Sequence, residues 1–232
     1  MVGGTTGGVQ AEVQGANESD GSWMAPDPLA SQPPYGQDPA AEPDALPEEL
    51  VSGVRPFESL VIVELAGSVA GAYAGKLFAG FGATVVKVEP PGGDPMRAVG
   101  EPLDGMGTTF AYLNTGKSSE VIDLSDAPGR AKLRALLRRA DAVIESASPG
   151  PLAPVTRGME ILGLIKAFVS PFGLTGPYAG YRSTSLTDFA AGGQLYLTGE
   201  RDREPVQGAG AHAEYAAGLH VFIGILAALR YR

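Results

Sequence analysis

Apolar residues gather into short, nearly continuous runs from about residue 59 onward. SLVIVEL and TVVKVE each have the pattern of a strand that is buried on both faces. Between them, AYAGKLFAGFG repeats apolar residues at helical spacing, with Tyr73, Leu77 and Phe78 on one stripe and two glycines at its end. This order of strand, helix and strand predicts a right-handed β-α-β unit.

The same alternation continues to the end of the chain. SSEVIDL, AVIES and LGLIKAFVS predict three more strands, and DAPGRAKLRALLRRADA predicts an amphipathic helix with Leu133, Leu136 and Leu137 facing inward. The last helices are expected in SLTDFAAGGQLYL and EYAAGLHVFIGILAALRYR. Strands and helices alternating at these lengths predict an α/β protein with a Rossmann-like, mainly parallel sheet and flanking helices.

The N-terminal segment lacks this periodicity and is rich in Gly, Pro, Ala, Asp and Glu. The first 58 residues carry ten acids and one base, which accounts for the formal net charge of −9 of the whole chain. Such a segment cannot bury enough apolar surface to offset its ordering entropy. We therefore predict a disordered tail over residues 1–56, acting as a solvated extension rather than an interaction segment, and a folded domain over residues 57–232.

Composition excludes several classes of function. The folded part has no basic patch, which argues against nucleic acid as a partner. The absence of cysteine removes disulfides and thiolate chemistry and fits a cytoplasmic location, and the first residues do not resemble a secretory signal. With only His212 and His220, no metal site is expected. The most apolar run, YAAGLHVFIGILAAL, is shorter than the roughly 20 residues that span a membrane, so we predict a buried helix.

The glycine turn after the first strand raises the question of a dinucleotide cofactor. Glu89 stands about where a ribose-binding acid would be expected. However, Gly67, Gly71 and Gly75 have the spacing G-x-x-x-G-x-x-x-G, and Val69 occupies the place of the glycine that approaches a pyrophosphate. The pattern therefore argues against a nicotinamide or flavin cofactor.

Several blocks taken together resemble the N-terminal half of family III CoA-transferases. They are VIVELAGSVAGAYAGKLFAGFGATVVKVEPPGGDPMR, PLDGMGTTFAYLNTGKSSEVIDL, DAPGRAKLRALLRRADAVIES, SPFGLTGPYAGY and the stretch that ends in LTGERDREPVQ. The resemblance covers about residues 57–232 and implies the N-terminal portion of a Rossmann-like large domain. It also implies a coenzyme A thioester as substrate, a carboxylic acid as acceptor and no permanently bound cofactor. In this family an aspartate attacks the acyl-CoA, and an enzyme–CoA thioester follows.

The resemblance assigns contacts with CoA residue by residue. Val69 and Ala70 match the first glycine turn, which lies close to CoA in relatives. Arg97 matches a basic position after the G-G-D-P turn, and Asn114 and Lys117 match the N-x-x-K stretch near the CoA nucleotide.

The catalytic position departs from the family pattern. Counting back from the LTG turn, the family's aspartate falls on Ser185, and Asp188 lies three residues later. Asp188 is either the nucleophile or the N3 residue of a capping box with Ser185 at the N-cap, and the capping interpretation is favoured. The candidate catalytic residues are thus Asp188 and Ser185, although Ser185 has no adjacent base. Ser148 replaces the arginine of a CoA-binding loop in the family.

Two functions follow. The first is an enzyme that transfers CoA between carboxylic acids. The second is a catalytically inactive CoA-binding or partner subunit, suggested by the replacements at Ser185 and Ser148 and by the match to only the N-terminal half of the family. Both imply a homo- or hetero-oligomer with a chain that supplies the other half. A racemase is a third reading, without a convincing acid/base pair to support it.

Overall fold

The computed structural model describes residues 55–232, apart from residues 104, 147–155 and 157–158. The predicted tail therefore lies almost wholly outside the described residues, as does Ser148. All of the described residues belong to one unit, which spans residues 54–232.

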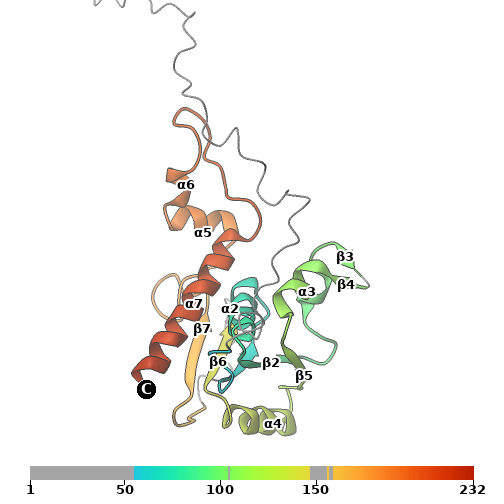
Figure 1. The fold of residues 1–232 in the computed structure, drawn as a ribbon. Coiled ribbons are helices and arrows are strands. Elements are labelled where there is room, and N and C mark those ends of the chain that lie inside the picture. Colours follow the sequence, from blue (N-terminus) through green and yellow to red (C-terminus); the bar gives the residue numbers. More distant parts are fainter. Residues whose placement is uncertain (1–54, 104, 147–155, 157–158) are drawn as a thin grey trace, which may run out of the picture. The chain divides into compact units, whose positions relative to one another are not determined.

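Five parallel strands form the central sheet (Figure 1). They are β1 (Val61–Leu65), β2 (Thr84–Glu89), β5 (Ser118–Val121), β6 (Ala142–Ser146) and β7 (Ile165–Val169). Their spatial order is β5-β2-β1-β6-β7, so the chain moves outward from β1 in one direction and then returns to continue in the other. Open parallel sheets bind ligands beyond the strand ends at this reversal, which is called the topological switch point. The predicted Rossmann-like, mainly parallel sheet is confirmed.

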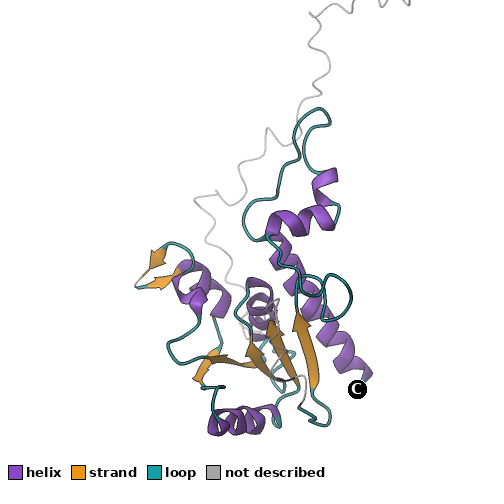
Figure 2. Ribbon diagram, turned by 180° about the vertical axis from the view of Figure 1, so that it is seen from behind, coloured by secondary structure: helices purple, strands orange, loops and turns teal. Residues whose placement is uncertain are grey.

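Helices cover both faces of the sheet. One face packs against α2 (Val69–Gly80) and α7 (His212–Tyr231), and the other packs against α4 (Ala127–Leu137). The period of two along β1 directs Ile62 to the first face and Val63 to the second, and both are fully buried. All five strands point toward the end of the sheet where α7 begins (Figure 2).

The glycines of α2 and α7 permit close packing. A Cβ at Gly71 would lie 2.3 Å from the Cβ of Ala66, and one at Gly75 would lie 2.1 Å from Oε2 of Glu64. A Cβ at Gly218 of α7 would lie 2.5 Å from the carbonyl oxygen of Ala70. Two glycines of the G-x-x-x-G-x-x-x-G repeat, Gly71 and Gly75, therefore let α2 pack closely against β1 and the turn after it. Gly218 lets α7 pack closely against α2 in the same way.

Helix α7 differs from the buried helix that the sequence predicts. It has 20 residues, and only Gly218, Phe222 and Ile225 are buried. Leu219 and Ile223 are 44% and 53% exposed. By length and composition alone, α7 is the one helix among the described residues that is long and apolar enough to cross a membrane. Its packing against α2 and β7 favours the role of a core helix.

The region after β2 contains short elements that the pattern of the sequence does not predict. They are the 3-10 helix η1 (Pro95–Ala98), the hairpin of β3 (Pro102–Leu103) and β4 (Met106–Gly107), and α3 (Thr108–Asn114). Helix α3 is too short for a periodic signal, and its burial of Phe110 and Leu113 against α2 and η1 stabilises it instead.

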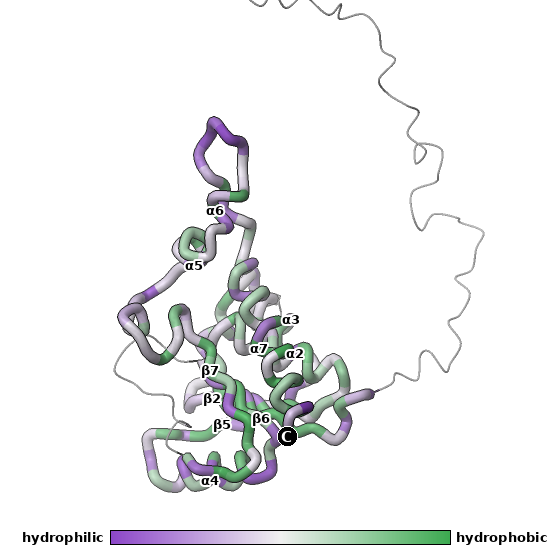
Figure 3. Tube along the Cα trace, turned by 90° about the vertical axis from the view of Figure 1, so that its left-hand side faces the viewer, coloured by the Kyte–Doolittle hydropathy of each residue, from purple (hydrophilic) through white to green (hydrophobic). Residues whose placement is uncertain are grey.

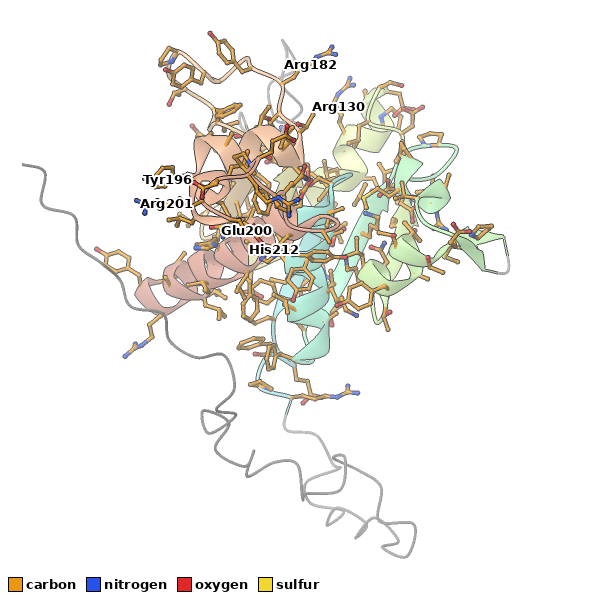
Figure 4. The ribbon with its side chains drawn as sticks, turned by 90° about the horizontal axis from the view of Figure 1, so that it is seen from above. Arg130, Arg182, Tyr196, Glu200, Arg201 and His212 are labelled. Carbon is orange, nitrogen blue, oxygen red and sulfur yellow. The ribbon has the colours of Figure 1, made fainter. Side chains whose placement is uncertain are left out.

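The segment before α7 contains α5 (Ser185–Ala191) and α6 (Gln194–Leu197). Within these two helices only Phe189 is buried. Tyr196 projects outward from α6 and is 92% exposed (Figure 4). The turn that follows, residues 200–204, is strongly hydrophilic (Figure 3). This segment is therefore held by few core contacts.

Candidate active site

A pocket of about 670 Å³ lies at the topological switch point. Its walls come from the segments that follow β1 and β7, from the last residue of β6, and from α5 and the first turns of α7. We call it the switch-point pocket, and the residues that matter to its chemistry are Ser68, Ala70, Ser146, Phe172, Asp188 and Glu214.

Two serines join the strands at the floor of this pocket. The hydroxyls of Ser68 and Ser146 lie 2.6 Å apart, which links the turn after β1 to the end of β6. Ser68 is also the N-cap of α2 and accepts a hydrogen bond of 3.3 Å from the amide of Gly71. A side-chain hydrogen bond thus connects β1 and β6 at the switch point. Ala70, in the first turn of α2, also lines the pocket.

The cap of α5 lies one residue earlier than the sequence predicts. Thr184, with an extended backbone, is the N-cap, and Thr187 is the N3 residue of the capping box. The hydroxyl of Thr187 accepts a hydrogen bond of 2.8 Å from the amide of Thr184. The predicted capping box of Ser185 and Asp188 is therefore wrong, because Thr187 already supplies the N3 acceptor.

Because the cap lies one residue earlier, Asp188 is not part of the capping box. Asp188 is half-buried and lines the switch-point pocket. Its carboxylate accepts one hydrogen bond from the hydroxyl of Ser183, at a long distance of 3.3 Å. A role in catalysis is compatible with this position and stays a prediction.

Ser185 occupies the first position of α5 and turns its hydroxyl toward α7. It donates a hydrogen bond of 2.6 Å to Oε1 of Glu214. Glu214 lies in the first turn of α7 and lines the switch-point pocket, whereas Ser185 is not among the residues that line it. Glu214 was not among the residues predicted for the site, although an acid one turn into a largely apolar helix was the available signal.

A second pocket, of about 340 Å³, lies toward the β5 edge of the sheet, between β2, β5 and α3. We call it the ionic cleft, and its charged and amide side chains are Lys87, Glu89, Arg97, Asn114 and Lys117. Three of the predicted CoA contacts, Arg97, Asn114 and Lys117, are brought together here, and Ala70 lines the switch-point pocket instead. Val69 packs against the cluster formed by α2 and α3.

Glu64 of β1 is the centre of the charges beneath this cleft. It is fully buried, and its two oxygens accept hydrogen bonds from Lys87 at 2.9 Å and from Lys117 at 2.6 Å. Lys87 also pairs with Asp94 at 2.7 Å. Burial lowers the pKa of Lys87, but the attraction of Glu64 and Asp94 outweighs burial, and the pKa is raised.

Lys117 has no free donor in this arrangement. Its ammonium group donates to Glu64, to the carbonyl of Ala72 at 2.8 Å and to Oδ1 of Asn114 at 3.0 Å. The amide nitrogen of Asn114 donates to the carbonyl of Phe110. Burial lowers the pKa of Lys117 more than Glu64 raises it. Contact of either side chain with CoA stays a prediction, and Lys117 would have to give up a bond to make it.

The rim of the ionic cleft carries a bidentate ion pair. Nε of Arg97 donates to one oxygen of Glu89 and Nη2 donates to the other, both at 2.7 Å. Hydrogen bonds from Arg97, Ser119 and the amide of Asp94 lower the pKa of Glu89 to about 2. The guanidinium of Arg97 also stands 4.4 Å above the ring of Phe110. The side chain of Arg97 is 42% exposed, whereas that of Lys117 is 1% exposed.

No group of three or more His, Cys, Asp or Glu side chains in the described part of the chain could hold a metal ion.

The sheet order and the switch-point pocket define an open α/β protein with a ligand site beyond the strand ends. Residues 57–232 match the model of CoA-transferase family III, and the chain belongs to that family.

The chain is similar to several characterised relatives. It is 36% identical over 183 residues to a subunit of the succinyl-CoA:(R)-benzylsuccinate CoA-transferase of Thauera aromatica, a match that covers 75% of this chain and 44% of the relative. It is 33% identical to the alpha subunit of the succinyl-CoA–L-malate CoA-transferase of Chloroflexus aurantiacus, over 96% of this chain and 50% of the relative. The chain thus spans about half the length of the curated relatives it matches.

Solved structures agree with this assignment. A CaiB/BaiF family protein from Brucella suis matches with a TM-score of 0.68 and 35% identity, over 76% of this chain and 50% of that one. The shared fold therefore extends over the sheet and its helices.

Proposed function

We propose that this protein is an enzyme that transfers CoA between carboxylic acids. The observation that carries the proposal is a switch-point pocket that presents two carboxylates, Asp188 and Glu214, within a CoA-transferase fold. A carboxylate suits this chemistry because its anhydride keeps the acyl group activated for exchange. Since the relatives are transferases, an inactive CoA-binding subunit is not favoured.

The substrates that we propose are dicarboxylic acids and their CoA thioesters. The names of similar relatives support this class, since they pair succinyl-CoA with benzylsuccinate, citramalate or malate. CoA is the substrate and group carrier, without a permanently bound cofactor. We further propose that Val69, Ala70, Arg97, Asn114 and Lys117 contact CoA, as the resemblance implies, and that the protein acts in the cytoplasm.

A second chain is expected to complete the site. The described residues that line the switch-point pocket include no Lys, Arg or His, although the proposed substrates are anions. Two similar relatives are named as subunits, which supports an oligomer of different chains. We therefore propose a homo- or hetero-oligomer in which the partner supplies cationic groups to this pocket.

An isotope-exchange assay tests the proposed activity without knowledge of the physiological acceptor. The chain, in the oligomer that completes its site, is incubated with succinyl-CoA and ¹³C-labelled succinate, and the label in succinyl-CoA is followed by mass spectrometry. We expect label to enter succinyl-CoA in the presence of the protein and not in the presence of a variant with Asp188→Asn and Glu214→Gln together. Exchange at equal rates with both proteins, or with neither, would contradict the proposed function.

A further inference from the structure

Glu214, which lines the switch-point pocket, has one buried carboxylate oxygen with unused hydrogen-bonding capacity. Among the described residues, Oε2 of Glu214 is the only buried side-chain nitrogen or oxygen without a hydrogen-bond partner. Leaving such an acceptor unpaired costs about 1–3 kcal/mol, and more for a charged group. Two of the buried acids, Glu64 and Glu89, have partners on both oxygens. Glu214 differs from them in this respect.

The opposite oxygen of Glu214 is fixed. Oε1 accepts the hydrogen bond of 2.6 Å from the hydroxyl of Ser185, which approaches from α5 outside the pocket wall. Glu214 also lies in the first turn of α7, where the helix dipole favours the charged carboxylate. One oxygen is thus held by Ser185 and the other is buried without a partner, so the carboxylate is oriented and poorly solvated.

We propose that Glu214 is the carboxylate that reacts with acyl-CoA, and that Ser185 is the residue that positions it. This inference rests on the proposed CoA-transfer function and names the residue that carries it out. Asp188 lines the same pocket, but its contact with Ser183 is long at 3.3 Å and it is less firmly oriented. Ser185 itself is a poor candidate nucleophile, because its proton is directed to Glu214 and its side chain does not line the pocket.

The reaction balances without any further reactant. An oxygen of Glu214 attacks the thioester carbonyl and forms a C–O bond, the C–S bond breaks, and CoA leaves as a thiolate, so that a mixed anhydride of Glu214 and the acyl group remains. The thiolate then attacks the δ-carbon of Glu214 and expels the donor acid as a carboxylate, which leaves a glutamyl-CoA thioester. The acceptor carboxylate attacks this thioester, CoA departs again, and the thiolate takes the acyl group from the second anhydride. Glu214 is regenerated, and no group is oxidised or reduced.

An ¹⁸O label identifies the reacting carboxylate. When the acceptor is ¹⁸O-labelled succinate, cleavage of the second anhydride leaves one labelled oxygen on the enzyme carboxylate. Trypsin cuts after Arg182, Arg201 and Arg203, so Asp188 and Glu214 fall on different peptides. After turnover with succinyl-CoA, we expect a mass increase of about 2 Da per exchanged oxygen on the peptide of Glu214, and fragment ions separate it from Glu204.

Matched variants distinguish the catalytic role of Glu214 from the positioning role of Ser185. Glu214→Gln should reduce CoA exchange by about 10³-fold or more, whereas Glu200→Gln, in the exposed turn, should leave it unchanged. Ser185→Ala should lower kcat by about 10–100-fold with the KM for succinyl-CoA unchanged, and Ser185→Thr should restore much of the loss. A purely structural role for Ser185 would not produce this separation of kcat from KM.

The outcomes distinguish this inference from the proposed function. Exchange that continues while the ¹⁸O label appears on Asp188 would overturn the role of Glu214 and leave the function standing. Exchange without label on any carboxylate would overturn it as well. The absence of both exchange and label would contradict the proposed function, and the inference with it.

Discussion

The two pockets of this protein use their charges in opposite ways. The ionic cleft has more charged groups, but each is paired: Glu64 with two lysines, and Glu89 with Arg97. Among the described residues that line it, the switch-point pocket has two charged groups, Asp188 and Glu214, and one oxygen of Glu214 has no partner. Paired charges stabilise a fold, whereas an unpaired one is retained at a cost to stability. The pocket with fewer charges is therefore the better candidate for catalysis.

The largest expected effect is the loss of a cation from the ionic cleft. Lys117→Met leaves Glu64 buried with Lys87 as its only cation, so we expect a decrease in the free energy of unfolding of about 3–5 kcal/mol. The midpoint of urea denaturation measures this loss. Failure of the variant to fold would agree with the prediction, and adding Glu64→Gln should then recover part of the stability.

An exposed ion pair provides the control for this prediction. Lys132 pairs with Glu120 on the surface, and Lys132→Met should cost less than about 1 kcal/mol. Equal losses for Lys117→Met and Lys132→Met would show that the ionic cleft does not hold the fold together.

The pH dependence of the free energy of unfolding tests the ion pair of Glu89 and Arg97 at the rim of the ionic cleft. The pKa of Glu89 is lowered to about 2, against about 4.5 for an unperturbed glutamate in the unfolded chain. Its contribution, about 3 kcal/mol by linkage, is therefore fully present above pH 4.5 and is lost as the pH falls toward 2. We expect Glu89→Gln to be less stable than the wild type at pH 7 by this order, with the difference in urea midpoint shrinking below pH 4.5. A constant difference down to pH 2.5 would contradict the pairing of Glu89 with Arg97.

Removal of a charge from the switch-point pocket should raise the free energy of unfolding, whereas removal of a charge from the ionic cleft should lower it. Glu214→Met removes the carboxylate whose Oε2 has no partner, and we expect the free energy of unfolding to rise by about 1 kcal/mol while CoA exchange is lost. Urea denaturation and the isotope-exchange assay measure the two effects on the same preparation. A loss of stability as large as that of Lys117→Met would mean that Glu214 is a structural residue like those of the ionic cleft.

The sequence reveals most of the sheet because burial on both faces leaves a local signature. All five strands and helices α2, α4, α5 and α7 are predicted near their observed positions. Helix α3 was missed, since its seven residues owe their stability to contacts with α2 and η1 rather than to their own pattern.

The chemistry of the two pockets could not be predicted in the same way. Lys117 and Glu64 are 53 residues apart in the sequence, and Ser185 and Glu214 are 29 apart. Such pairs form only because the fold brings distant elements together. The assignment of Ser185 as an N-cap failed for a local reason, since two adjacent residues, Thr184 and Ser185, can both cap a helix and only the backbone decides between them.

The smallest expected effect on stability tests whether Thr184, rather than Ser185, is the N-cap of α5. It also tests whether Asp188 takes no part in that cap. Thr184→Ala removes the acceptor for the amide of Thr187, which should destabilise α5 by about 1 kcal/mol and speed amide exchange there about fivefold. Ser185→Ala should leave amide exchange in α5 nearly unchanged, because Ser185 bonds to Glu214 rather than to the backbone. Hydrogen exchange of the Asp188 amide, which donates to the carbonyl of Thr184, reports both results. If Ser185→Ala opened the helix instead, the cap would belong to Ser185, and the side chain that orients Glu214 would have to be sought elsewhere.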